Sequence, residues 1–115
     1  MRDYKYGVFT SDQILEEKKW LRKQIYFLLL IVDRATADQY PYVDVPSAIR
    51  DVQLQLAGLN ELLGYPREVV SAASLIEAAL EEYGRDPFRF KIYRKLILDA
   101  GNEIIRDGEV DHAEP

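Results

Sequence analysis

The side chains in this chain that are best suited to binding chemistry are five cations, which are interleaved with aromatic rings in the segment RDPFRFKIYRK. Guanidinium and ammonium groups neutralise phosphate while rings stack on bases, so such a cluster can bind a nucleotide or a short nucleic acid. The cations are Arg85, Arg89, Lys91, Arg94 and Lys95. The competing interpretation places the rings in the core and pairs the cations with Glu77, Glu81 and Glu82. We favour this second interpretation because the chain as a whole is acidic, with a net charge of -5.

Residues for covalent or acid-base catalysis are scarce. The chain has no cysteine, and its single histidine, His112, falls in the acidic segment 109–115, which we expect to be a disordered tail. The familiar Ser-His-Asp and Cys-His arrangements are therefore not expected. Carboxylates such as Glu77 and Glu81 have the i,i+4 spacing of a solvated helix face, and no phosphate-loop or HExxH motif is present. The sequence predicts that the protein is not an enzyme and uses no metal or cofactor.

Composition indicates a folded protein of ordinary domain size. The chain has 115 residues, of which 48% are apolar and 30% charged, as in globular proteins. The absence of cysteine favours the cytoplasm, and the first ten residues contain no apolar segment of the secretory type. The longest apolar run, residues 25–32, is far shorter than the roughly 20 residues that a membrane helix needs. We therefore expect a cytoplasmic protein that does not enter a membrane.

Helical signals divide the chain into four segments. Thr10 and Gln13 form a capping box ahead of a long first helix, predicted over residues 11–37. Three further helices are expected to open at Pro46, Pro66 and Pro87, the last behind an Asp86 cap, and to stop at Gly64, Gly84 and Gly108. Because the later connectors are short, neighbouring helices should run antiparallel.

The predicted fold class is all-α, as a four-helix bundle or a compact four-helix domain with a long first helix. We expect residues 1–10 to form an N-terminal arm, residues 11–108 a single helical domain and residues 109–115 the tail. A helix in a small bundle normally needs only one apolar stripe to pack against the core. The first helix is apolar on all sides within residues 25–32, and this surplus is the main clue to function.

Two explanations account for the surplus apolar surface. The first helix could be the central one, packed by the other three, or part of its surface could be covered by another chain. The pattern of the second helix favours the explanation that another chain covers this surface. The second helix also has apolar residues opposite its main stripe, and Gly58 between them would permit close approach. The candidate partner-binding residues are Trp20, Phe27, Leu30, Ile31, Leu54 and Leu62.

The sequence therefore predicts a small binding protein that acts through protein-protein contact and self-association, most simply as a two-fold dimer. The alternative is a protein that binds or sequesters an anionic ligand through the cations of the fourth helix. A second basic run, Lys18, Lys19, Arg22 and Lys23, follows Glu16 and Glu17 in the first helix. Small acidic all-helical chains are common among accessory and inhibitor proteins of phages and mobile elements, an association of type alone.

Overall fold

The computed structural model describes residues 2–4 and 7–106, with side chains from residue 10 onward. The four helices are α1 (Ser11–Leu30), α2 (Val45–Leu63), α3 (Arg67–Tyr83) and α4 (Phe90–Ile104). The predicted tail, His112 and the predicted stop at Gly108 lie outside the described residues.

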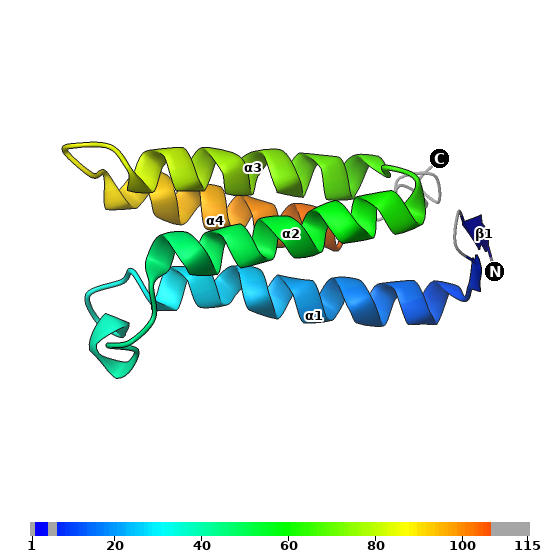
Figure 1. Cartoon of the computed structure of the whole chain (residues 1–115), viewed down its shortest axis with the longest axis horizontal. Helices are drawn as coiled ribbons and strands as arrows, with labels where there is room; N and C mark the ends of the chain where they lie inside the picture. Colours follow the sequence, from blue (N-terminus) through cyan, green and yellow to red (C-terminus); the bar gives the residue numbers. More distant parts are fainter. Residues whose placement is uncertain (1, 5–6, 107–115) are drawn as a thin grey trace.

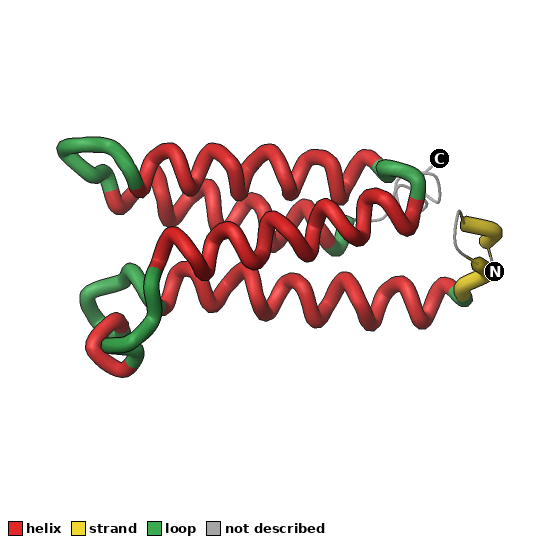
Figure 2. The backbone as a smooth tube through the Cα atoms, in the orientation of Figure 1, coloured by secondary structure: helices red, strands yellow, loops and turns green. Residues whose placement is uncertain are grey.

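The helices form an elongated antiparallel bundle, and the predicted all-α four-helix fold is confirmed (Figure 1). Each helix packs against its neighbours in the chain, and α4 returns to pack against α1. The α1–α2 contact is the sparsest of these four. A longer connector, residues 31–44, joins α1 to α2 at one end of the bundle (Figure 2).

The predicted capping box of α1 is present, and α2 has an N-cap that the sequence analysis did not identify. Gln13 donates its backbone N–H to the Thr10 hydroxyl at 3.0 Å, and the Gln13 side chain accepts from the Thr10 N–H at 2.8 Å. At the start of α2 the Asp44 carboxylate accepts from the Ser47 N–H at 3.0 Å. Gly64 ends α2 with φ of 78°, in the left-handed region that glycine enters without a steric cost. Pro46 in the first turn and Gly64 after the last turn had predicted the bounds of α2 correctly.

Helix α1 ends seven residues before the predicted position 37. Beyond Leu30 the backbone leaves the helix, and two short side chains form hydrogen bonds with backbone groups of this segment. The Thr36 hydroxyl donates to the Leu30 carbonyl at 2.6 Å, and the Asp33 carboxylate accepts from the Ala35 N–H at 2.9 Å. Such local side-chain bonds give the backbone an alternative to the helix. The prediction overlooked this competition.

Helix α4 begins at Phe90, and the prediction that Asp86 and Pro87 would open it was wrong. The N-cap is Arg89, whose side chain makes no capping hydrogen bond. Its backbone N–H instead donates to the Glu82 carboxylate in the last turn of α3, at 3.2 Å. A carboxylate from the preceding helix therefore binds the residue at which α4 starts, and the predicted Asp86 cap is not formed.

A short hairpin precedes α1. Strands β1 (Arg2–Tyr4) and β2 (Gly7–Phe9) pair antiparallel, with Arg2 opposite Phe9. Strands of three residues are too short to produce a readable alternation, so the sequence had suggested only an arm here.

Side chains from all four helices meet in one core. Its largest fully buried member, Tyr93 on α4, donates its hydroxyl to the Leu28 carbonyl of α1 at 2.7 Å. Burial raises the pKa of Tyr93 well above its ordinary value. Lys18 of α1 is also buried and forms an ion pair with Glu68 at the start of α3, at 2.5 Å. Together these contacts fix α1 against α3 and α4, which leaves its approach to α2 as the loosest part of the bundle.

Candidate binding groove

A groove lies between the first half of α1 and the second half of α2, where the contact between these helices is sparse. It encloses about 460 Å³, within the range of about 300–1,000 Å³ that is usual for small-molecule pockets. Nine residues line this α1/α2 groove: Gln13, Ile14, Glu17, Trp20, Gln55, Gly58, Leu59, Leu62 and Leu63. Apolar side chains predominate, so the groove can bury a substantial part of a ligand or partner.

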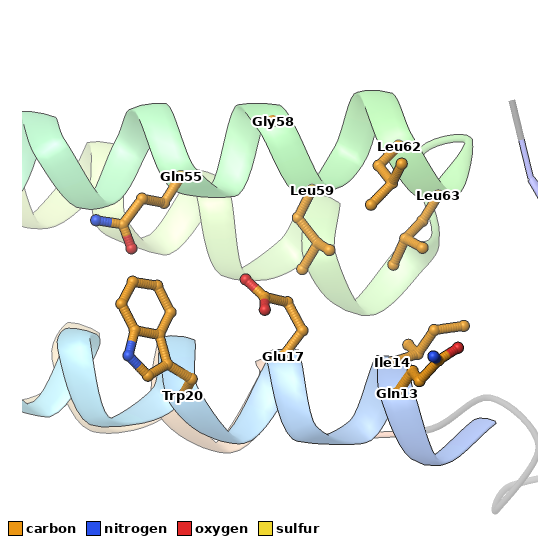
Figure 3. A pocket seen from close by; sticks show the side chains of 9 residues that line it. All are labelled: Gln13, Ile14, Glu17, Trp20, Gln55, Gly58, Leu59, Leu62 and Leu63. Carbon is orange, nitrogen blue, oxygen red and sulfur yellow. The ribbon is translucent and has the colours of Figure 1, made fainter. Parts of the chain in front are cut away.

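Three polar side chains and one indole give the α1/α2 groove its chemical character. Figure 3 shows Glu17 reaching from α1 toward α2, and Gln55 reaching from α2 toward Trp20 with its oxygen directed at α1. That oxygen is buried, and no donor among the described residues reaches it. Glu17 forms no ion pair with any cation in the described ranges. The groove therefore contains an unpaired carboxylate and an unsatisfied acceptor.

Three of the predicted partner-binding residues are exposed on the bundle. Trp20 borders the groove with 47% of its surface exposed, and Leu54 on α2 is 71% exposed. Leu30, at the opposite end of α1, is 38% exposed. A leucine as exposed as Leu54 in mid-helix contributes nothing to the core of its own chain, so its apolar surface is free for another contact.

The other three predicted partner-binding residues pack within the chain. Ile31 follows the last turn of α1 and is buried in the core, with 6% exposed. Phe27 is half-buried and packs edge-on against the Tyr40 ring of the connector, with ring centroids 5.0 Å apart. Leu62 is half-buried in the wall of the groove. The apolar run 25–32 therefore serves mainly the chain's own core and connector.

The predicted anionic-ligand cluster is divided by Glu82. This carboxylate, buried at the end of α3, receives the Arg89 guanidinium at 2.9 Å and lies 3.7 Å from the Arg85 guanidinium. The hydrogen bond from the Arg89 side chain is the main cause that lowers the pKa of Glu82, against an opposing effect of burial. Two of the five predicted cations are thus engaged by the bundle itself, as the structural interpretation of this segment anticipated for Glu82.

The remaining three cations lie on the exposed side of α4. Lys95 pairs with Asp99 one turn away at 2.7 Å, while Lys91 and Arg94 have no ion pair within the part of the chain that is described. The interleaved rings pack against one another, since Phe88 lies edge-on to both Tyr83 and Tyr93. The surface offers charge for an anion, and its most exposed ring, Phe88, is 37% exposed while it contacts both tyrosines.

A second hollow, of about 400 Å³, lies between α2 and α3. Its one buried polar side chain is Asn60, whose Oδ1 has no hydrogen-bond partner among the residues described. The wall includes the small side chains Ala57, Ala73 and Ser74. Its aromatic residue is Tyr65, and its aliphatic side chains are Val70, Ala57 and Ala73. The α1/α2 groove has the larger aliphatic wall, formed by Ile14, Leu59, Leu62 and Leu63, and is therefore the better candidate site.

Over residues 2–4 and 7–106, no group of three histidine, aspartate or glutamate side chains is placed to hold a metal ion. None of the helices in these ranges is long and apolar enough to cross a membrane. Comparisons of the chain with protein-family models, with curated proteins and with solved structures find no match. Functional inference for this protein therefore depends on its own geometry.

Sequence reasoning selected Trp20, Leu54 and Leu62 but missed the groove that two of them line. Glu17 and Gln55 had no distinguishing signal, because a glutamate and a glutamine on helices usually face water. Only the packing of α1 beside α2 brings them to the same groove. The partial signal was Gly58, which the sequence identified as a point of close approach.

Proposed function

We propose that this chain is a non-enzymatic binding protein that associates with a second copy of itself through α2 and the α1/α2 groove. The proposal rests on an exposed leucine that lies beside an open space on the same face of α2. Leu54 projects with 71% of its surface exposed, while a β-carbon added at Gly58 would meet nothing within 4 Å. Each copy thus presents both halves of a complementary contact.

The spacing of these two residues suits a two-fold contact. Leu54 and Gly58 are four residues apart, so they lie on one face of α2 about 6 Å apart along its axis. In a two-fold contact, if residue i touches residue j, then j touches i. Antiparallel packing of α2 on its copy, with the symmetry axis midway between the two residues, sets each Leu54 over the other chain's Gly58.

Trp20 extends the proposed contact from α2 onto α1. It is half exposed at the edge of the groove into which Leu54 of the second copy would reach. Tryptophan is enriched among the residues that carry most of the binding energy at protein interfaces. Its position beside the hollow gives the contact an aromatic anchor.

The non-enzymatic part of the proposal is supported by what lines the groove. Glu17 is its single titratable side chain. General acid-base chemistry commonly needs a donor and an acceptor of different proton affinity within reach of the same substrate. The groove provides shape and apolar surface, which favour binding over catalysis, and the proposed site of action remains the cytoplasm.

Analytical ultracentrifugation of three variants tests the proposal. Burying a leucine side chain contributes about 1.5–3 kcal/mol, so L54E should weaken association by at least about tenfold. G58M should weaken it equally by filling the hollow. I92E, which places the same charge on an exposed apolar position of α4, is the matched control and should leave association unchanged. Equal association constants for all three variants and the wild type would refute the contact.

A second candidate is the binding of an anionic ligand by α4. It is supported by Lys91 and Arg94, which are exposed and lack an ion pair within residues 7–106. Because Arg85 and Arg89 form ion pairs with Glu82, this candidate function depends on fewer available cations than the sequence suggested. The geometry therefore favours the self-association proposal.

A further inference from the structure

The polar groups directed into the α1/α2 groove share one electrostatic property. The Glu17 carboxylate carries a negative charge without an ion pair in the described ranges, and the buried Gln55 oxygen lacks a donor. The face of the Trp20 indole is also electron-rich. No lysine or arginine lines the groove. The site is therefore matched to a ligand that supplies positive charge and N–H donors.

Each group would interact with a different part of such a ligand. A carboxylate forms charge-assisted hydrogen bonds with an ammonium or amidinium group. An indole face attracts cations within about 6 Å of its centre, with an energy of about 0.5–2 kcal/mol. The aliphatic wall of Ile14, Leu59 and Leu62 would cover an apolar body.

We infer that the α1/α2 groove is a binding site for a small organic cation, an ammonium or amidinium group attached to an aromatic or branched hydrocarbon. The enclosed volume of about 460 Å³ suits a small molecule. All the groups that recognise it belong to one chain, so this binding goes beyond the proposed self-association and does not require it. Because Leu54 of a second copy would reach into the same groove, the cation and the second copy would compete for it.

Trp20 is the only tryptophan in the chain, so its fluorescence reports on the groove alone. The test is a titration with 2-phenylethylammonium at a chain concentration where light scattering shows a monomer. The neutral 2-phenylethanol and the anionic 3-phenylpropionate serve as matched probes. We expect saturable binding of the cation, at least about tenfold tighter than that of the neutral probe, and none of the anion.

Two carboxylate variants make the test specific. E17Q should reduce the affinity for the cation by about tenfold and remove the preference over the neutral probe. E16Q removes an adjacent exposed carboxylate that does not line the groove, and it should change nothing. Absence of saturation, equal affinity for the three probes, or equal effects of E17Q and E16Q would overturn the inference.

A cationic group can also come from a lysine side chain of another protein. Nα-acetyl-lysine amide is the probe for this source. Tighter binding of that probe than of 2-phenylethylammonium would assign the groove to a protein segment and overturn the small-molecule assignment. Because the measurement uses the monomer, its failure is distinct from a failure of the self-association proposal.

Discussion

The ring of Tyr26 on α1 lies against the backbone of Gly101 on α4, so closely that a β-carbon at Gly101 would stand 2.2 Å from the ring. The Tyr26 hydroxyl continues past the glycine to donate to the Asn102 side chain at 3.1 Å. At Gly58, the other glycine inside a helix of the described chain, the space is open. The two positions show that α1 is closely fitted to α4 and loosely fitted to α2.

Alanine substitutions at these two glycines should have opposite effects on stability. G58A removes the entropic cost of glycine in a helix and meets no neighbour, so the free energy of unfolding should rise by about 0.5–1 kcal/mol. G101A displaces the Tyr26 ring and should lower it by about 1–3 kcal/mol. Urea denaturation of both variants at low chain concentration measures the difference. A gain in stability at both positions would mean that Tyr26 does not pack on Gly101.

The buried ion pair between Lys18 and Glu68 should show strong coupling. K18M leaves a carboxylate that is only 12% exposed without its partner, and we expect a loss of about 3–5 kcal/mol. The double variant K18M/E68L removes both charges and should recover most of that loss.

The exposed pair Lys95–Asp99 provides the control for this cycle, since its side chains are 76% and 42% exposed. K95M should change the free energy of unfolding by no more than about 0.5 kcal/mol. A full double-mutant cycle for each pair, measured by denaturant unfolding, gives the coupling energy of the buried pair and of the exposed pair. If K18M cost no more than K95M, Lys18 would not be buried against Glu68.

Most of the bundle could be predicted from sequence, because caps and prolines are local signals. Thr10, Pro46 and Gly64 lie where the pattern suggested. The start of α4 was predicted wrongly, because the Asp86–Pro87 pattern is a common helix-opening signal and nothing in it showed that the Arg89 backbone N–H would bond to Glu82. The burial of Lys18 was hidden because its partner is 50 residues away, while the local pattern placed it in a solvated charge run.

The contribution of Glu82 to the free energy of unfolding should depend on pH. Its pKa is lowered below the ordinary value of 4.5, chiefly by Arg89. A carboxyl whose pKa is lower in the folded state binds protons more readily when unfolded. Its stabilising effect is therefore present above pH 4.5 and is lost as the pH falls through the lowered value.

Urea unfolding of the wild type and E82Q across this pH range measures the effect. The wild type should be the more stable at neutral pH, and the difference should shrink on acidification. R89M should reproduce the behaviour of E82Q, because it removes the main cause of the shift. A stability difference that stayed constant with pH would show that the Glu82 charge is not stabilised by Arg89.

Binding of anions by α4 can be separated from the stability of its first turn. Substituting Arg89 would disturb the Glu82 contact, so the informative variant is K91E/R94E, which changes two exposed cations. If the second candidate function holds, a short single-stranded oligonucleotide should bind the wild type with an affinity that falls as salt rises, and K91E/R94E should abolish that binding. Retention of oligonucleotide by K91E/R94E would remove α4 from consideration.

The molar mass in solution tests the central proposal most directly. Light scattering on the purified chain at tens of micromolar should give twice the chain mass of 13.3 kDa, and L54E should return it to the single-chain value while I92E does not. A wild-type protein that remains at 13.3 kDa under these conditions would contradict self-association through Leu54 and Gly58.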